Sequence, residues 1–168
     1  MQKRAVCLLI DETPSMNLGK PAFAQINQFL KELSALGDYV ALVIAEFNNA
    51  RLEIQEPMPI SCAPELSPRY PEEGYGTKLY SSINKITEAV QGYHYAAVVV
   101  LSDGRDNERN ERVKSTLGTF PKGWDLLVVG FESDRYALIR ELIPQAKEFQ
   151  SLSNVSQYTL SKLSDKEI

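Results

Sequence analysis

One stretch decides the fold: Cys7-Leu8-Leu9-Ile10-Asp11-Glu12-Thr13-Pro14-Ser15-Met16. Its apolar half predicts a buried strand, which stops abruptly at Asp11. Thr13 and Ser15 follow at alternate positions before a helical pattern begins. In open α/β sheets, ligands bind beyond the carboxyl ends of the strands. A carboxylate and two hydroxyls at such a place are hard oxygen ligands, which suit Mg²⁺ or Mn²⁺.

Further apolar runs alternate with helical patterns along the rest of the chain. Strands are predicted at 5–10, 39–47, 51–57, 96–101, 124–131 and 147–152, and helices at 21–36, 77–90, 108–117 and 135–143. Strands that are apolar throughout favour a parallel sheet covered on both faces. The segment 51–57 follows a turn signal, Asn48-Asn49, and is only half apolar, so it is predicted to run antiparallel at a sheet edge.

Two segments carry little regular pattern. Residues 57–76 contain five prolines and form the one long irregular connection, and long loops in compact domains are often functional. The polar tail at 153–168 is expected to form at most a closing turn of helix.

The composition is typical of one globular domain spanning 1–168, since 43% of the 168 residues are hydrophobic and 24% are charged. A net charge of −4 argues against nucleic acid or an anionic membrane as a general partner. The N-terminal apolar run is too short for a signal peptide, and no stretch reaches the roughly 18 apolar residues of a membrane span. We therefore expect a soluble, cytoplasmic protein. Cys7, Cys62 and the single His94 are too few for a disulfide framework or a zinc site.

Three segments are expected to meet at the carboxyl edge of the sheet. They are the loop from Asp11 to Ser15, the pair Gly76-Thr77 that enters a helix, and the pair Asp103-Gly104 that closes a strand. Together they supply two carboxylates and three hydroxyls, which a small octahedral cation can use directly or through water. Two protein charges only balance a divalent ion, so the site should also attract a carboxylate from outside.

These segments resemble the metal-ion-dependent adhesion site of von Willebrand factor type A (VWA) domains. That site combines Asp-x-Ser-x-Ser, a distant Gly-Thr and a strand-terminal Asp-Gly, and the matching residues here are Asp11, Thr13, Ser15, Thr77 and Asp103. The resemblance covers nearly the whole chain. It implies a doubly wound, mostly parallel, six-stranded α/β sheet with one antiparallel edge strand and helices on both faces. It also implies Mg²⁺ or Mn²⁺ as cofactor, and a non-enzymatic role in which a partner protein's Asp or Glu completes the coordination.

Two positions depart from the family pattern. Thr13 stands where the family has a serine, so the hydroxyl is kept and a methyl group is added. Pro14 replaces a small residue, which fixes φ and stiffens the loop. As a lone domain, the chain resembles small bacterial and phage VWA proteins of the tellurium-resistance type, which occur with kinase, phosphatase or ATPase partners.

Ordinary structural roles exist for the same residues. A single hydroxyl often caps a helix, and Asp103 before a glycine can be turn chemistry alone. Asp106 is expected to be a loop or helix-start residue and not a ligand. Tyr70, Tyr75 and Tyr80 either pack in the core or line the rim of the site.

An enzymatic function would need catalytic side chains, such as a histidine or a general base, close to the acidic residues. His94 begins a strand, at the opposite edge from Asp11, so a Ser-His-Asp triad is not expected. The alternative function is a Mg²⁺-dependent phosphoester hydrolase that uses the same acidic edge. It requires a nucleophile or general base, for which only Glu12 and Asp106 are spare.

Overall fold

The computed structural model describes residues 3–13, 16, 18–48, 51–68, 78–107 and 110–164. Within this part of the chain one sheet holds the strands β1 (Arg4–Asp11), β2 (Val40–Phe47), β3 (Leu52–Ile54), β4 (Met58–Pro59), β5 (Tyr95–Leu101), β6 (Asp125–Val129) and β7 (Lys147–Phe149). The α-helices are α1 (Lys20–Leu33), α2 (Leu79–Ala89), α3 (Glu111–Leu117), α4 (Ser133–Leu142) and α5 (Leu152–Leu163). Two 3₁₀ helices, η2 (Ser34–Tyr39) and η3 (Ile60–Cys62), precede and follow the antiparallel edge.

The strand order across the sheet is β3-β2-β1-β5-β6-β7, and β4 also pairs with β2. Every pair is parallel except those of β3 and β4 with β2. The predicted α/β fold, mostly parallel with one antiparallel edge, is therefore confirmed. The edge is divided into two short strands where a single one at 51–57 was expected. Pro57 lies at the break, and proline has no N–H to donate to a neighbouring strand.

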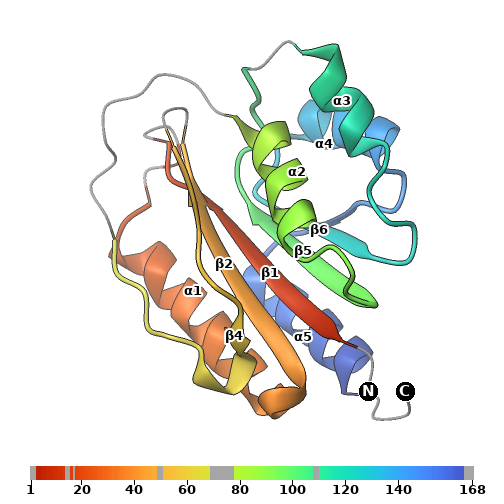
Figure 1. Cartoon of the computed structure of the whole chain (residues 1–168). Coiled ribbons are helices and arrows are strands. Elements are labelled where there is room, and N and C mark those ends of the chain that lie inside the picture. Colours follow the sequence, from red (N-terminus) through yellow and green to blue (C-terminus); the bar gives the residue numbers. More distant parts are fainter. Residues whose placement is uncertain are drawn as a thin grey trace.

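Helices cover both faces of the sheet (Figure 1). α1 contacts α5 on one face, whereas α2 contacts β1, β2 and α3 on the other. The two central strands lie between these layers, so the side chains of 5–10 in β1 and 96–100 in β5 are fully buried. Each aliphatic side chain buried in this way contributes roughly 1.5–3 kcal/mol. The parallel pairing of these strands brings their carboxyl ends to one edge of the sheet, with Asp11 as the last residue of β1 and Asp103 two residues beyond β5.

Helix α1 shows the predicted apolar stripe. Its buried residues are Phe23, Ile26, Phe29, Leu30 and Leu33. Pro21 lies in its first turn, where a missing N–H costs nothing because first-turn N–H groups have no partner within the helix. At 14 residues α1 is the longest helix described, and no described helix has the length and apolarity needed to cross a membrane.

The C-terminal segment differs from the expectation. The polar tail was predicted to form at most one helical turn, but α5 is a helix of 12 residues that packs on α1. Its buried face includes Ser156 and Thr159 beside Leu152, Val155 and Leu163. These buried polar residues disguise the amphipathic pattern that predicts helices from sequence. Ser156 is satisfied on α1, where its hydroxyl donates to Glu32 Oε2 at 2.9 Å.

The Pro-rich connection is more ordered than expected in its first part. It contains β4 and η3, and Ile60 is completely buried. Asn27 of α1 anchors the following residues, since its amide donates to the carbonyl of Leu66 (2.8 Å) and accepts from the N–H of the same residue (2.7 Å). Residues 69–77, which include the predicted rim residues Tyr70 and Tyr75, lie outside the described residues.

Candidate functional site

Asp11 is the last residue of β1, and it is completely buried (0% exposed). Its Oδ1 accepts hydrogen bonds from the backbone N–H of Thr13 (2.9 Å) and from the Thr13 hydroxyl (2.6 Å). Its Oδ2 accepts a hydrogen bond from the Ser102 hydroxyl at 2.7 Å. These donors hold the carboxylate in one orientation at the carboxyl edge of the sheet.

The charge on Asp11 has only neutral donors around it. No cationic side chain among the described residues pairs with this carboxylate, and Asp103 adds a second negative charge nearby. Burial raises the pKa of Asp11 above its ordinary value, although the hydrogen bonds from Thr13 and Ser102 oppose the shift. Buried carboxylates in proteins are normally paired with a cation or bound to a metal. The site therefore fits a divalent cation, because it offers hard oxygens and a buried charge that no described side chain neutralises.

Thr13 is buried and takes part in this arrangement through its hydroxyl. The hydroxyl donates its proton to Asp11, and a hydroxyl oxygen is a hard ligand of the kind that Mg²⁺ accepts. It does not cap the following helix, because α1 begins after Gly19 and has no side-chain cap. The loop is closed by the N–H of Met16, which donates to the carbonyl of Thr13 at 3.0 Å.

Ser102 belongs to the site and was not singled out from the sequence. Its hydroxyl donates to Asp11 and accepts from the N–H of Gly104 at 3.1 Å, so it joins the loops that follow β1 and β5. Its place follows from the strand register, in which Ile10 pairs with Leu101 so that the next residues on the two parallel strands become neighbours, and this register is not visible in the sequence.

Asp103 lies one residue beyond Ser102, in a tightly packed loop. Its Oδ1 accepts a hydrogen bond from the N–H of Arg105 at 2.9 Å, and its carbonyl accepts one from the N–H of Glu132 at 3.1 Å. Gly104 follows with φ of +87°, and a Cβ there would lie 2.8 Å from the Phe131 ring. Glycine is therefore required by packing at position 104, and the same packing holds the loop against the start of α4.

Asp106 has the structural role that was expected of it. Its Oδ1 accepts a hydrogen bond from the N–H of Tyr80 at 3.0 Å, in the first turn of α2. This contact ties the loop that carries Asp103 to the helix that follows Thr77. Tyr80 itself is buried, so it is a core residue and not part of an exposed rim.

Ser15 and Thr77 lie outside the described residues, so the structure reports on Asp11, Thr13 and Asp103 of the predicted set. Within the described part of the chain, no three His, Cys, Asp or Glu side chains form a metal-binding group.

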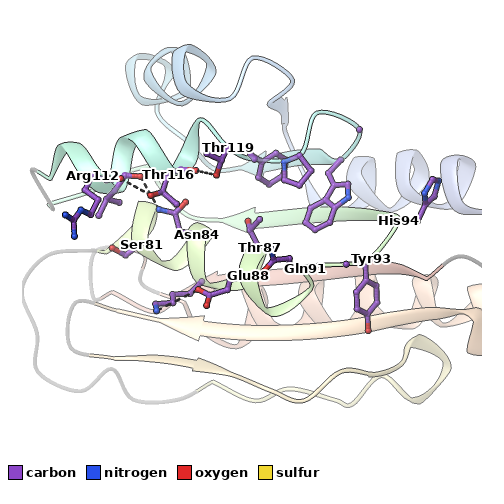
Figure 2. A pocket seen from close by; sticks show the side chains of 17 residues that line it. Ser81, Asn84, Thr87, Glu88, Gln91, Tyr93, His94, Arg112, Thr116 and Thr119 are labelled. Atoms are coloured by element: carbon purple, nitrogen blue, oxygen red, sulfur yellow. Dashed lines mark hydrogen bonds and ion pairs between the residues drawn. The ribbon is translucent and has the colours of Figure 1, made fainter.

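A surface groove lies elsewhere on the described part of the chain (Figure 2). It has a volume of about 820 Å³ and runs between α2 and α3, ending near Tyr93 and His94. Along it the hydroxyls of Thr87 and Thr116 donate to carbonyls of their own helices. Neither Asp11 nor Asp103 lines it. His94 lies at the amino end of β5, as predicted, where its N–H donates to the carbonyl of Lys3 at 2.8 Å.

The fold is shared with solved structures of known proteins. The VWA2 protein of Sulfolobus acidocaldarius, a paralog of ArnB, superposes with a TM-score of 0.62 at 21% identity. The conserved hypothetical protein BatB of Bacteroides thetaiotaomicron gives a TM-score of 0.67 at 14% identity, and the pilus adhesin SpaC of Lactobacillus rhamnosus GG gives 0.66 at 14%. The chain has a VWA fold.

These similarities differ in how much of each protein they cover. The three superpositions include 94%, 96% and 98% of this chain for VWA2, BatB and SpaC respectively. They include 99% of BatB, but only 44% of VWA2 and 30% of SpaC. No family model matches the sequence, and no curated protein matches it. At these identities the likeness establishes the VWA fold alone.

Proposed function

We propose that this protein is a metal-dependent protein-recognition module that performs no chemistry of its own. The observation that carries the proposal is the environment of Asp11, a fully buried carboxylate with neutral donors beside a second acidic residue. Such a carboxylate is costly in a metal-free core and is stabilised by a bound cation. The VWA fold supports the proposal, because it is commonly a metal-dependent interaction module.

The residues that would hold Mg²⁺ or Mn²⁺ are Asp11, Thr13, Ser15, Thr77 and Asp103. Asp11 is held in place by Ser102, and Thr13 presents hydroxyl lone pairs beside it. The loop of Asp103 is fixed by the backbone hydrogen bond from Glu132. When bound, the cation supplies an electrophilic centre that accepts further oxygen ligands.

The partner would present an Asp or Glu side chain to the ion. Asp11 and Asp103 together carry two negative charges, which balance a divalent ion without exceeding its charge. A third carboxylate is then attracted and not repelled. The Pro-rich connection, 57–76, and the loop after Asp103 are the candidates for a rim that selects the partner, since prolines reduce the entropy lost on binding. Within this connection β4 pairs with Ala41 and Leu42 near the amino end of β2, so only the residues after η3 remain candidates for the rim.

The proposal extends to the cellular setting. We place the protein in the cytoplasm, as a VWA protein of the tellurium-resistance type that acts with kinase, phosphatase or ATPase partners.

Calorimetry on the purified chain tests metal binding directly. Wild type should bind one Mg²⁺ or Mn²⁺ per chain, and Asp11→Asn should lose binding while keeping its fold. Asparagine keeps the shape and can still accept from Thr13, while its NH₂ can donate to Ser102. Exposed Glu141→Gln is the matched control, because it removes a carboxylate far from the site in the chain.

Capture of partners from a lysate, with and without EDTA, tests recognition. Specific partners should be lost with EDTA and with Asp103→Ala, and recovered with added Mg²⁺. Partner binding that survives EDTA and both aspartate substitutions would show that the domain acts through another face. Hydrolysis of a generic phosphoester by wild type, but not by Asp11→Asn, would favour the hydrolase alternative.

A further inference from the structure

Arg135 lies in the first turn of α4 and reaches back to Asp103. Its Nη1 is 3.7 Å from Asp103 Oδ1, and its Nη2 is 3.3 Å from Glu132 Oε2. Both members of the first pair are largely buried, with side chains 22% and 20% exposed. The Cβ of Arg135 also packs against Gly104, so that a Cβ at Gly104 would lie 2.9 Å from it. The guanidinium of Arg135 is thus held beside Asp103, one of the proposed metal ligands.

The contact with Asp103 is an ion pair without a hydrogen bond. Arg135 Nη1 is inaccessible to solvent and has no hydrogen-bond partner among the described residues. A salt bridge selected for stability alone normally satisfies its donors, because an unpaired buried donor is unfavourable. Oδ1 of Asp103 instead accepts a hydrogen bond from the backbone N–H of Arg105. This arrangement brings the positive charge of Arg135 close to Asp103 without a hydrogen bond between these two side chains.

We propose that Arg135 is a positioning residue that acts as a built-in counter-ion for Asp103 and sets the metal affinity of the site. This inference rests on the proposed function, because it assumes that Asp103 is a metal ligand. In the metal-free protein the guanidinium balances the charge of Asp103. A bound divalent cation competes with it for the same carboxylate, and Glu132 then remains as the partner of the arginine. The site is thereby tuned to bind metal weakly alone and more strongly when a partner's carboxylate is added.

The sign of the effect separates this role from a purely structural one. If Arg135 only held the loop, its removal would disorder Asp103 and weaken metal binding. If it is a competing cation, its removal should strengthen metal binding, because opposite charges a few ångströms apart attract each other and a bound cation must overcome the attraction between Arg135 and Asp103.

Calorimetry with Mn²⁺ alone is the test, on wild type and three variants. Arg135→Gln keeps much of the side chain and removes the charge, and it should bind Mn²⁺ about tenfold more tightly than wild type. Arg135→Lys keeps the charge and should stay within about threefold of wild type. Arg140→Gln, on the same helix but exposed and stacked on Tyr136, should match wild type. Thermal unfolding without metal checks that each variant folds.

Each outcome decides a different point. Tighter binding by Arg135→Gln alone supports the inference. Weaker or unchanged binding by folded Arg135→Gln, with wild type binding metal, overturns the inference and leaves the proposed function standing. If neither folded wild type nor folded Arg135→Gln binds Mn²⁺, the inference and the proposed function are both overturned. Should Arg135→Gln fail to fold, Arg135→Met in the same assay gives the same comparison, and tighter, weaker or unchanged binding is interpreted in the same way.

Discussion

The hydroxyl of Ser102 donates a hydrogen bond of 2.7 Å to Oδ2 of Asp11, across 91 residues of sequence. The bond joins the ends of the two central strands, both buried, at the edge where the proposed metal ligands lie. It also leaves the Ser102 oxygen free to accept from the N–H of Gly104. The side chain of Ser102 therefore links the loop that follows Asp11 to the loop that contains Asp103.

Ser102→Ala should lower the free energy of unfolding by about 2 kcal/mol, because it removes a donor to a buried carboxylate and an acceptor for a backbone N–H. Urea unfolding of the metal-free protein measures this. Ser115→Ala, on the exposed surface of α3, is the control and should change stability by less than about 0.5 kcal/mol. Equal stability of the two variants would mean that Ser102 does not support Asp11.

Substitutions at Thr13 separate coordination from packing. Thr13→Ser keeps the hydroxyl and should bind Mg²⁺ or Mn²⁺ as wild type does. Thr13→Val keeps the shape but loses the oxygen beside Asp11, so the metal affinity should fall at least about tenfold, the equivalent of one lost polar interaction. Calorimetry on the pair measures the difference. Equal affinities in the serine and valine variants would assign Thr13 to packing alone.

Gly104 and Gly37 form a matched pair for a test of backbone strain. Both have positive φ, +87° and +78°, but a Cβ at Gly104 meets Phe131 and Arg135, whereas a Cβ at Gly37 meets nothing within 4 Å. Gly37→Ala should cost about 1–3 kcal/mol of unfolding free energy from its backbone conformation alone, because φ of 78° with ψ of −152° is a combination that is nearly limited to glycine. Gly104→Ala should cost about 1–3 kcal/mol more, because the loop must also move. Similar costs for both would contradict the close packing at Asp103.

The environment of Asp125 leads us to expect that the protein loses stability at acidic pH. Burial tends to raise its pKa, but hydrogen bonds to Oδ2 from Lys162 (2.6 Å), Tyr95 (2.6 Å) and Tyr158 (3.0 Å) outweigh burial, so the pKa is lowered below its ordinary 3.8. A lowered pKa adds stability that is fully present above pH 3.8 and is lost as the pH falls through the folded-state value.

Asp125→Asn should therefore lower stability at neutral pH, by about 1–3 kcal/mol, and should flatten the loss of stability below pH 4. The measurement is urea unfolding at a series of pH values. Glu141→Gln, an exposed carboxylate on α4, should leave the acid response almost unchanged. A variant at Asp125 with the full acid dependence of wild type would show that its ion pairs contribute nothing.

Local patterns predicted the sheet well, for reasons visible in particular elements. The apolar runs that became β1, β2, β5 and β6 are buried on both faces, so almost every residue in them had to be apolar. Asp11 and Asp103 could be placed together because the carboxyl ends of parallel strands share one edge. The boundaries moved by a few residues, and the edge strand divided at its proline, because hydrogen bonding and not hydrophobicity decides where pairing stops.

The sequence by itself determined the strands, the face that α1 buries and the acidic edge, since each has a short-range signature in apolar spacing or in a residue that ends a strand. Only the tertiary structure decided the roles of Ser102 and Arg135, and the existence of α5. Arg135 meets Asp103 from 32 residues away, and Lys162 meets Asp125 from 37. Such contacts depend on how helices pack against the sheet and on distances of a few ångströms. Neither produces a periodic pattern in the sequence from which the contact could be predicted. Ser156 and Thr159 show the same limit, because their burial follows from the position of α1 and not from their own polarity.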